Sequence, residues 1–123
     1  MRQDIDLYTV SSTDTVRTAM QKITANKHRA VVVIDGGRVV GTVSDGDIRR
    51  ALLKDVLPMA PVEQIMNLNC VMTTERDPGK VAELMRRHRV TVMPVVTASK
   101  ELVDVGLAYE PFDEGPAVRR PKG

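Results

Sequence analysis

Aromatic residues are nearly absent from this sequence. Tryptophan does not occur, and the aromatic total of 2% consists of Tyr8, Tyr109 and Phe112. Proteins that bind single-stranded nucleic acid commonly stack bases on aromatic side chains. A large excess of one charge is missing too, because 18 basic residues face 16 acidic ones, for a net charge of +2. A balanced charge gives no general attraction to DNA or to an anionic membrane. We therefore expect neither nucleic acid nor membrane as a partner.

Cysteine and long apolar runs are scarce as well. Cys70 is the only cysteine, so an internal disulfide is excluded, and no His/Cys cluster at metal-ligand spacing surrounds it. We expect Cys70 to be a small buried residue and expect no metal site. No run of residues is long and apolar enough for a membrane span, and the first residues lack the apolar segment of a signal peptide. The sequence thus predicts a cytoplasmic protein.

The composition that remains is that of a globular domain. Of 123 residues, 42% are hydrophobic and 28% charged, which suits one compact domain with a modest core. With so few aromatics, the core must consist of aliphatic side chains and methionines, among them Met20, Met72, Met85 and Met93. The chain has no phosphate-binding loop of the form Gly-x-x-x-x-Gly-Lys, no glycine-rich nucleotidyltransferase loop and no catalytic constellation. We predict that it is not an enzyme and has no cofactor.

The first half of the chain alternates strand and helix patterns. Ile5, Leu7 and Val10 predict a short first strand. Apolar residues then recur at helical spacing from Val16 to Ile23, and this helix should end near residues 26–27. The β-branched run 30–34, a turn at 35–37 and the segment 38–43 predict a hairpin, followed by a helix over 45–54. The pattern is that of an α/β fold.

The second half repeats this order. After a linker marked by Pro58 and Pro61 and a short helical turn at 62–66, a strand is predicted at 70–73, a helix opened by Asp77 and Pro78, and a strand at 92–96. Aligning the two halves matches Val16 with Val81, Asp35 with Thr97, and Gly41 with Gly106, so equivalent positions lie about 65 residues apart. A tandem duplication is the simplest explanation.

The stretch 41–53 contains the best candidate for ligand contact. Ser44 stands where a strand ends and a helix begins, and a helix N-terminus stabilises phosphate through its unpaired N–H groups. The Asp47 carboxylate could accept hydrogen bonds from ribose hydroxyls, and Arg49 and Arg50 add positive charge nearby. These features suit a nucleotide. Ser44-x-x-Asp47 is also the pattern of a capping box, in which both side chains serve the helix itself. On spacing alone the capping box is the better interpretation.

A resemblance favours the nucleotide. Gly41-x-x-Ser44-x-x-Asp47-Ile48, after the strand 31–35 and a Gly36-Gly37 turn, resembles the signature of a cystathionine β-synthase (CBS) domain. The longer string Gly-Thr-Val-Ser-Asp-Gly-Asp-Ile-Arg-Arg-Ala-Leu-Leu is similar to the tandem CBS pairs, or Bateman modules, attached to sugar-1-phosphate nucleotidyltransferases. The resemblance covers about Leu7 to Ala108. It implies two β-α-β-β-α motifs packed with pseudo-two-fold symmetry around a nucleotide cleft, and ligand-binding residues at Arg29, Ala30, Val31, Thr42, Val43, Ser44, Asp47 and Arg49.

We expect a first motif over 5–57, a linker over 58–68, a second motif over 69–112 and a mobile tail over 113–123. With the offset above, Tyr109 stands opposite Ser44 and Phe112 opposite Asp47, while Pro111 disfavours a closing helix in the second motif. One site should therefore remain.

The resulting prediction is a regulatory module that binds an adenine nucleotide (AMP, ADP or ATP), forms a homodimer and signals to an attached or partner enzyme, with a sugar-phosphate nucleotidyltransferase as the candidate. The alternative is a scaffold that binds no ligand and serves dimerisation or docking.

Overall fold

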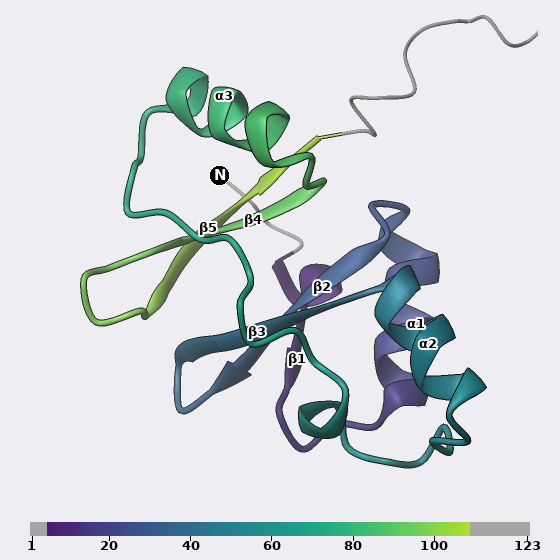
Figure 1. Cartoon of the computed structure of the whole chain (residues 1–123). Helices are drawn as coiled ribbons and strands as arrows, with labels where there is room; N and C mark the ends of the chain where they lie inside the picture. The colour runs from purple at the N-terminus through teal and green to yellow at the C-terminus, as the bar shows by residue number, and fades with distance from the viewer. Residues whose placement is uncertain (1–4, 109–123) are drawn as a thin grey trace, which may run out of the picture.

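The computed structural model describes residues 5–108, which form two similar halves (Figure 1). The first half consists of a 3-10 helix η1 (Ile5–Tyr8), β1 (Thr9–Ser11), α1 (Val16–Asn26), β2 (Ala30–Asp35), β3 (Arg38–Ser44) and α2 (Asp45–Leu53). A short 3-10 helix, η2 (Val62–Gln64), lies in the connection to the second half. That half consists of α3 (Pro78–His88), β4 (Val92–Val96) and β5 (Leu102–Leu107). The predicted α/β fold is confirmed.

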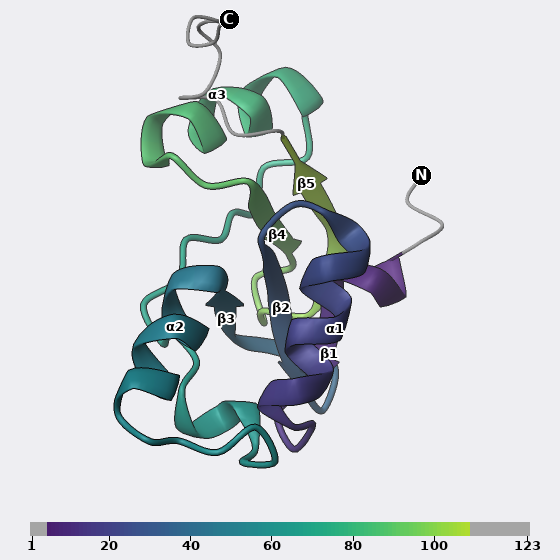
Figure 2. The same cartoon turned by 90° about the vertical axis from the view of Figure 1, so that its right-hand side faces the viewer.

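The first half is a three-stranded sheet covered by two helices. β1 pairs parallel to β2, and β2 pairs antiparallel to β3. Figure 2 looks onto α1 and α2, with the strands behind them. Apolar side chains of both helices pack with residues from one face of the sheet in a buried cluster, which includes Val16, Ala19, Ile23, Val31, Val33, Val43 and Ile48. The β2 valines are buried on both faces, as the continuous β-branched run predicted.

The second half is a hairpin with one helix over it. β4 and β5 are antiparallel, and α3 packs on one face through Val81 and Met85 against Met93 and Val95. The other face of the hairpin meets the first sheet in a shared cluster that contains Tyr8, Val32, Val39, Val92, Val96 and Val105.

Hydrogen bonds also join the two halves. Val39 N–H donates to Lys100 C=O at 2.9 Å, Leu102 N–H donates to Gly37 C=O at 3.3 Å, and the Thr91 hydroxyl donates to His28 C=O.

Each hairpin contains a β-bulge, and the bulges decide which side chains face the other half. Val33 pairs with Gly41 but Ile34 pairs with Val39, so Val40 is an extra residue in β3. An extra residue reverses the alternation of side chains along a strand. Val39 therefore lies in the cluster between the halves while Val43 lies under the helices, although the two are an even number of residues apart. In the second hairpin, Val103 is the extra residue, since Val95 pairs with Asp104 and Val96 with Leu102.

The pairing corrects the predicted offset between the repeats. Val92 is the counterpart of Ala30, 62 positions later, and their partners Leu107 and Ser44 are 63 positions apart. The helix N-caps Thr15 and Asp77 are also separated by 62 positions. The offset of 65 was wrong because it matched Gly41 to Gly106, which face different neighbours: Gly41 lies against Met66 and Asn67, and Gly106 against α3. The counterpart of Ser44 is Leu107, and the same count places Glu110 in the sequence opposite Asp47.

Three local predictions were also wrong. Ile5 and Leu7 belong to η1, so only Thr9–Ser11 form the first strand. The segment 70–73 pairs with β4 only at Thr73, which bridges to Val95. Met20 is 36% exposed on α1 instead of filling the core. The interpretations that concern Tyr109, Pro111, Phe112, the missing closing helix and the tail 113–123 fall outside the described residues.

Candidate functional site

The candidate site begins at the N-terminus of α2, where the predicted capping box is present. Ser44 is the N-cap with extended backbone angles (φ −111°, ψ 169°), and its hydroxyl oxygen accepts from Asp47 N–H at 3.2 Å. In return, Asp47 Oδ2 accepts from Ser44 N–H at 2.9 Å and from the Ser44 hydroxyl at 3.0 Å. The two side chains therefore stabilise the helix start in the manner that the spacing favoured.

The capping box leaves Asp47 with spare hydrogen-bonding capacity. An ionised carboxylate offers about four acceptor positions, and two are used by Ser44. Asp47 Oδ1 accepts from Arg50 Nη2 at 2.8 Å, and the Asp47 side chain is 16% exposed. One acceptor position on Oδ1 is thus left for a ligand. A second becomes available if Arg50 moves away.

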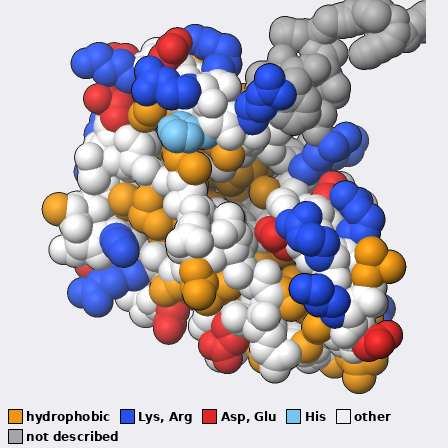
Figure 3. Space-filling view, viewed as in Figure 1, with side chains coloured by type: hydrophobic (Ala, Val, Ile, Leu, Met, Phe, Trp, Pro, Cys, Tyr) orange, Lys and Arg blue, Asp and Glu red, His pale blue; other side chains and the backbone are white. Residues whose placement is uncertain are grey.

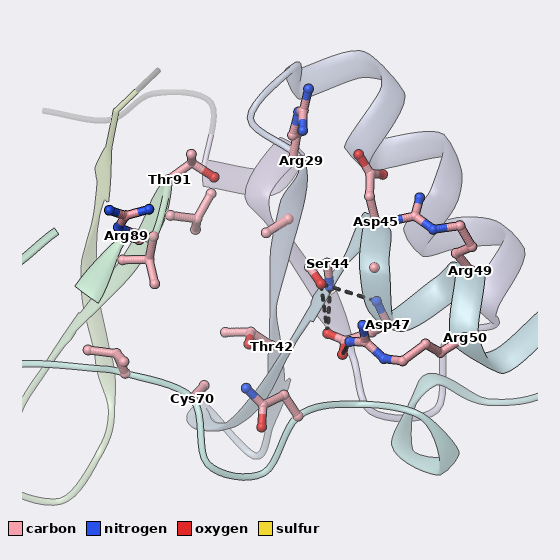
Figure 4. Close-up of a pocket in the computed structure, with 16 residues that line it drawn as sticks. Arg29, Thr42, Ser44, Asp45, Asp47, Arg49, Arg50, Cys70, Arg89 and Thr91 are labelled. Atoms are coloured by element: carbon pink, nitrogen blue, oxygen red, sulfur yellow. Dashed lines mark hydrogen bonds and ion pairs between the residues drawn. The ribbon is translucent and has the colours of Figure 1, made fainter. Parts of the chain in front are cut away.

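A cavity of about 410 Å³ opens beside this helix start, between the two halves. Its walls come from β2, β3, α2, the connection after η2 and the segment that leads from α3 into β4. It is lined by Arg29, Ala30, Thr42, Ser44, Asp45, Gly46, Asp47, Arg49, Arg50, Asn67, Cys70, Val71, Arg89, Val90, Thr91 and Val92. Figure 4 shows Arg89 and Thr91 across from Ser44 and Asp47. A pocket of 300–1,000 Å³ is typical for a small-molecule ligand.

Six of the eight predicted site residues line this cavity: Arg29, Ala30, Thr42, Ser44, Asp47 and Arg49. Val31 and Val43 do not. Both are fully buried in the core under α1 and α2, because residues on either side of Ala30 and Ser44 in the strands point to the opposite face of the sheet. Their side chains are therefore not part of the candidate site.

The sequence analysis did not foresee the wall from the second half. Arg89, Val90, Thr91 and Val92 complete the cavity, together with Cys70 and Val71. A correct repeat offset would have indicated them. Residues 27–30 precede and begin β2 in the first half, and 89–92 are their counterparts in the second.

The electrostatics of the cavity favour an anion. Four arginines and two aspartates line it, so positive charge is in excess by two. The cavity also includes the first turn of α2, where the helix dipole is positive. Asp45 N–H donates to Arg29 C=O at 3.1 Å, which ties this turn to the residue before β2. Arg29 holds an uncommon left-handed conformation (φ 70°) at this point. Figure 3 shows Lys and Arg side chains gathered on the right of the hollow between the halves, over the helices of the first half.

Cys70 is the one thiol of the chain and lies half-buried in the cavity wall. Burial raises its pKa above the ordinary value of 9.0, and a backbone hydrogen bond and the positive charge of Lys100 lower the pKa by less. The thiol is therefore protonated at neutral pH and is a weak nucleophile.

Between residues 5 and 108 no helix has the length and apolar character needed to cross a membrane. No three His, Cys, Asp or Glu side chains among these residues converge as they would around a metal ion.

Comparison with known proteins gives one family match and one curated relative. Residues 1–54 match the sequence model of the CBS domain family. Over 112 residues, the chain is 28% identical to an inosine-5′-monophosphate dehydrogenase from Korarchaeum cryptofilum, a match that covers 87% of this chain and 22% of that enzyme. The chain thus spans about a fifth of the length of this curated relative.

Two solved structures share the fold over most of the described residues. A CBS domain protein from Pyrobaculum aerophilum, complexed with AMP, superimposes with a TM-score of 0.64 at 27% identity, covering 82% of this chain and 83% of that one. An acetoin utilization protein from Vibrio cholerae superimposes with a TM-score of 0.71 at 23% identity, covering 81% and 76%.

Proposed function

We propose that this CBS domain pair binds one adenine nucleotide of the AMP, ADP or ATP class in the cleft between its halves and acts as a regulatory module, not as an enzyme. The observation that carries the proposal is the composition of the cavity walls. One wall offers a helix N-terminus and the Ser44–Asp47 pair, and the other offers Arg89 and Thr91.

Each part of a nucleotide has a chemically suitable neighbour in this cavity. The phosphate suits the first turn of α2 and the surrounding arginines. A ribose hydroxyl suits the acceptor position left on Asp47 Oδ1. The base suits the apolar lining of Ala30, Val71, Val90 and Val92. The AMP complex of the related protein from Pyrobaculum aerophilum supports the same ligand class.

The enzyme or process that would respond to the ligand is a separate part of the proposal. The motif in residues 41–53 resembles that of CBS pairs on sugar-phosphate nucleotidyltransferases, whereas the curated relative is an IMP dehydrogenase. The motif resemblance and the curated relative both point to enzymes that make nucleotides or sugar nucleotides. A sugar-phosphate nucleotidyltransferase is the partner that we would test first. The test measures the activity of this enzyme with and without the module, in the presence and absence of AMP.

A second candidate, a scaffold that binds no nucleotide, is favoured by one observation. Ser44 and Asp47 already satisfy each other in the capping box, and Asp47 also holds Arg50. If this were their whole role, substituting Asp47 would cost stability without affecting any ligand.

Thermal unfolding with and without AMP, ADP, ATP or S-adenosylmethionine separates the two functions. A ligand at 100 times its dissociation constant adds roughly 2.7 kcal/mol to the free energy of unfolding. We expect AMP to stabilise the wild type and Asp47→Ala to lose this response, while losing about 1 kcal/mol of its own stability as a broken cap.

Asp77→Ala is the matched control. Asp77 caps α3 by accepting from Lys80 N–H at 3.0 Å and does not line the cavity. This variant should lose a similar amount of stability and keep the full AMP response. An intact AMP response in Asp47→Ala, or no nucleotide response in the wild type, would favour the scaffold.

A further inference from the structure

The side chain of Arg50 folds back over the first turn of its own helix. Its Nη2 lies 2.8 Å from Asp47 Oδ1, one turn earlier. A Cβ atom placed on Gly46 would lie 3.2 Å from Arg50 Nη1, so the guanidinium sits directly beside the Gly46 backbone. The Arg50 side chain is 65% exposed. Figure 4 shows it beside Asp47, at the end of α2 that faces the cavity.

This position is the one that a phosphate at the helix N-terminus would approach. Asp45 and Asp47, the two carboxylates of the first turn, would by themselves repel such a group. The Arg50 guanidinium neutralises Asp47 and has further N–H donors directed away from it, since a guanidinium carries five. An arginine can bind phosphate through two parallel hydrogen bonds.

We infer that Arg50 determines the specificity of the site for ligands with an anionic 5′ group. This inference rests on the proposed function. In the structure Arg50 is paired with Asp47. When a nucleotide binds, the guanidinium donates to the phosphate, and the Oδ1 position that it leaves accepts a ribose hydroxyl. Breaking an exposed pair at i, i+3 spacing costs little, so the exchange favours the nucleotide. Adenosine has a neutral 5′ group, and S-adenosylmethionine has a sulfonium cation there. Neither ligand offers Arg50 an anion in place of the Asp47 carboxylate.

Isothermal titration of Arg50→Gln with AMP, and with adenosine in competition against AMP, tests this role. We expect the Kd for AMP to rise about tenfold, as for the loss of a charge-assisted hydrogen bond. The Kd for adenosine should change less than about twofold, so that the preference for AMP over adenosine falls. Arg50→Lys should recover part of the loss, because it restores the charge without the planar fork.

Arg86→Gln is the matched control for the ion pair itself. Arg86 Nη2 lies 2.8 Å from Glu83 Oε1 at the same i, i+3 spacing, with a side chain that is 62% exposed, and it does not line the cavity. Its substitution should leave the affinities for AMP and adenosine unchanged. Arg49→Gln removes an equal charge from the preceding position of α2, which also lines the cavity. It therefore measures how much a positive charge at this end of the helix contributes to AMP affinity without the pairing to Asp47.

Equal losses in Arg50→Gln and Arg49→Gln, equal losses for AMP and adenosine, or tighter AMP binding by Arg50→Gln would overturn the role of Arg50. In each of these outcomes the wild type still binds AMP, so the proposed function survives. If the wild type binds neither AMP nor adenosine, the proposed function fails first and the role of Arg50 fails with it.

Discussion

At the scale of a single residue, the reactivity of Cys70 can be used to detect ligand in the cavity. It is the only cysteine in the chain and lines the cavity, so any thiol reagent labels one known position. Because burial raises the pKa of this thiol, its thiolate fraction at pH 7.5 is small. We expect maleimide to label the native protein more slowly than the urea-unfolded chain, and AMP to slow the reaction further. A labelling rate that AMP does not alter would place the ligand elsewhere.

The same thiol gives stability a pH dependence of known sign. The pKa of Cys70 is raised in the folded state above the ordinary thiol value of 9.0. The contribution of this thiol to the free energy of unfolding is therefore fully present below pH 9.0 and is lost as the pH rises through the folded-state pKa. The wild type should therefore lose more stability than Cys70→Ala between pH 8 and the alkaline limit of the native state. Chemical unfolding at several pH values measures the difference.

Residue identities in the first wall of the site could be predicted because they lie in one continuous stretch. Thr42, Ser44 and Asp47 belong to a local motif whose strand, turn and helix start are all visible in the sequence. Arg89 and Thr91 were missed because they reach the cavity only through the packing of one half against the other. Arg50 was noted as a nearby charge, but its pairing with Asp47 depends on a rotamer that no sequence pattern specifies.

At the scale of elements, Gly41 fixes the distance between β3 and the connection that follows η2. A Cβ atom at this position would lie 2.9 Å from Asn67 C=O and 3.1 Å from the Met66 side chain. Thr42 and Asn67 exchange two backbone hydrogen bonds, of 3.2 Å and 2.8 Å, across the same contact. Because the near atom is backbone, it cannot turn aside as a side chain would. Asn67 is also part of the cavity wall.

Gly41→Ala should therefore destabilise the protein by about 1–3 kcal/mol, as overpacking does in a close-packed interior, and should weaken AMP binding by displacing residue 67. Gly79→Ala is a suitable control, since Gly79 lies in α3 and its added Cβ would meet only an Asp77 side-chain oxygen at 3.3 Å. Alanine there should be neutral or mildly stabilising. Urea unfolding compares the two, and equal stability would show that the connection yields freely.

Most elements were predictable because their ends are marked by local chemistry. Side-chain caps at Ser44 and Asp77 begin α2 and α3, and the Gly36-Gly37 turn, with positive φ at both residues, closes the first hairpin. The cap of α1, Thr15, was not foreseen. The errors occurred where longer-range contacts decide. The segment Ile5–Tyr8 has apolar residues at strand spacing but packs as a 3-10 turn against α1 and β5. The repeat offset was misread because Gly41 and Gly106 were matched by residue type, whereas the strand pairing makes Leu107 the counterpart of Ser44.

At the scale of the whole molecule, the two halves differ in the chemistry that they present to the cleft. The counterparts of Thr42 and Ser44 are Val105 and Leu107, which offer no hydroxyl. Val105 is fully buried in a cluster with Tyr8, and Leu107 packs against this cluster. The second position is therefore occupied by the protein's own apolar side chains. We expected a single site because Tyr109 and Phe112 were aligned with Ser44 and Asp47. The expectation now rests on Val105 and Leu107 instead.

Calorimetry should give one AMP per chain. Tyr109→Ala should leave the affinity nearly unchanged, because residue 109 is no longer the counterpart of Ser44. Two equivalent sites, or a large loss of affinity in Tyr109→Ala, would show that the second half contributes a pocket of its own despite its apolar lining.

A homodimer remains a prediction, and exposed apolar surface supports it. Leu53 at the end of α2 and Leu57 and Met59 in the connection after it are 79%, 70% and 68% exposed. A second cavity of about 400 Å³, lined largely by apolar residues of α3, β4 and β5, is also open in the described part of the chain. Apolar surface of this kind is commonly covered by a second copy. Sedimentation equilibrium at micromolar concentration should give twice the chain mass of 13.6 kDa, and a purely monomeric species would contradict the prediction.

Val40, the extra residue in β3, separates the turn of the first hairpin from the part of the strand that reaches the site. Thr42 and Ser44 lie after Val40, and the face on which they lie follows from their partners in β2, Val32 and Ala30. A chain that lost residue 40 and kept the rest would have almost the same composition and the same strand propensity. It would also keep the pairs Ile34–Val39, Val33–Gly41, Val32–Thr42 and Val31–Val43, now without a bulge, so Thr42 and Ser44 would stay at the cleft and Val43 in the core. A relative that lacks one residue at this point of the hairpin can therefore keep the same polar side chains at the cleft and lose only the local bend of the strand.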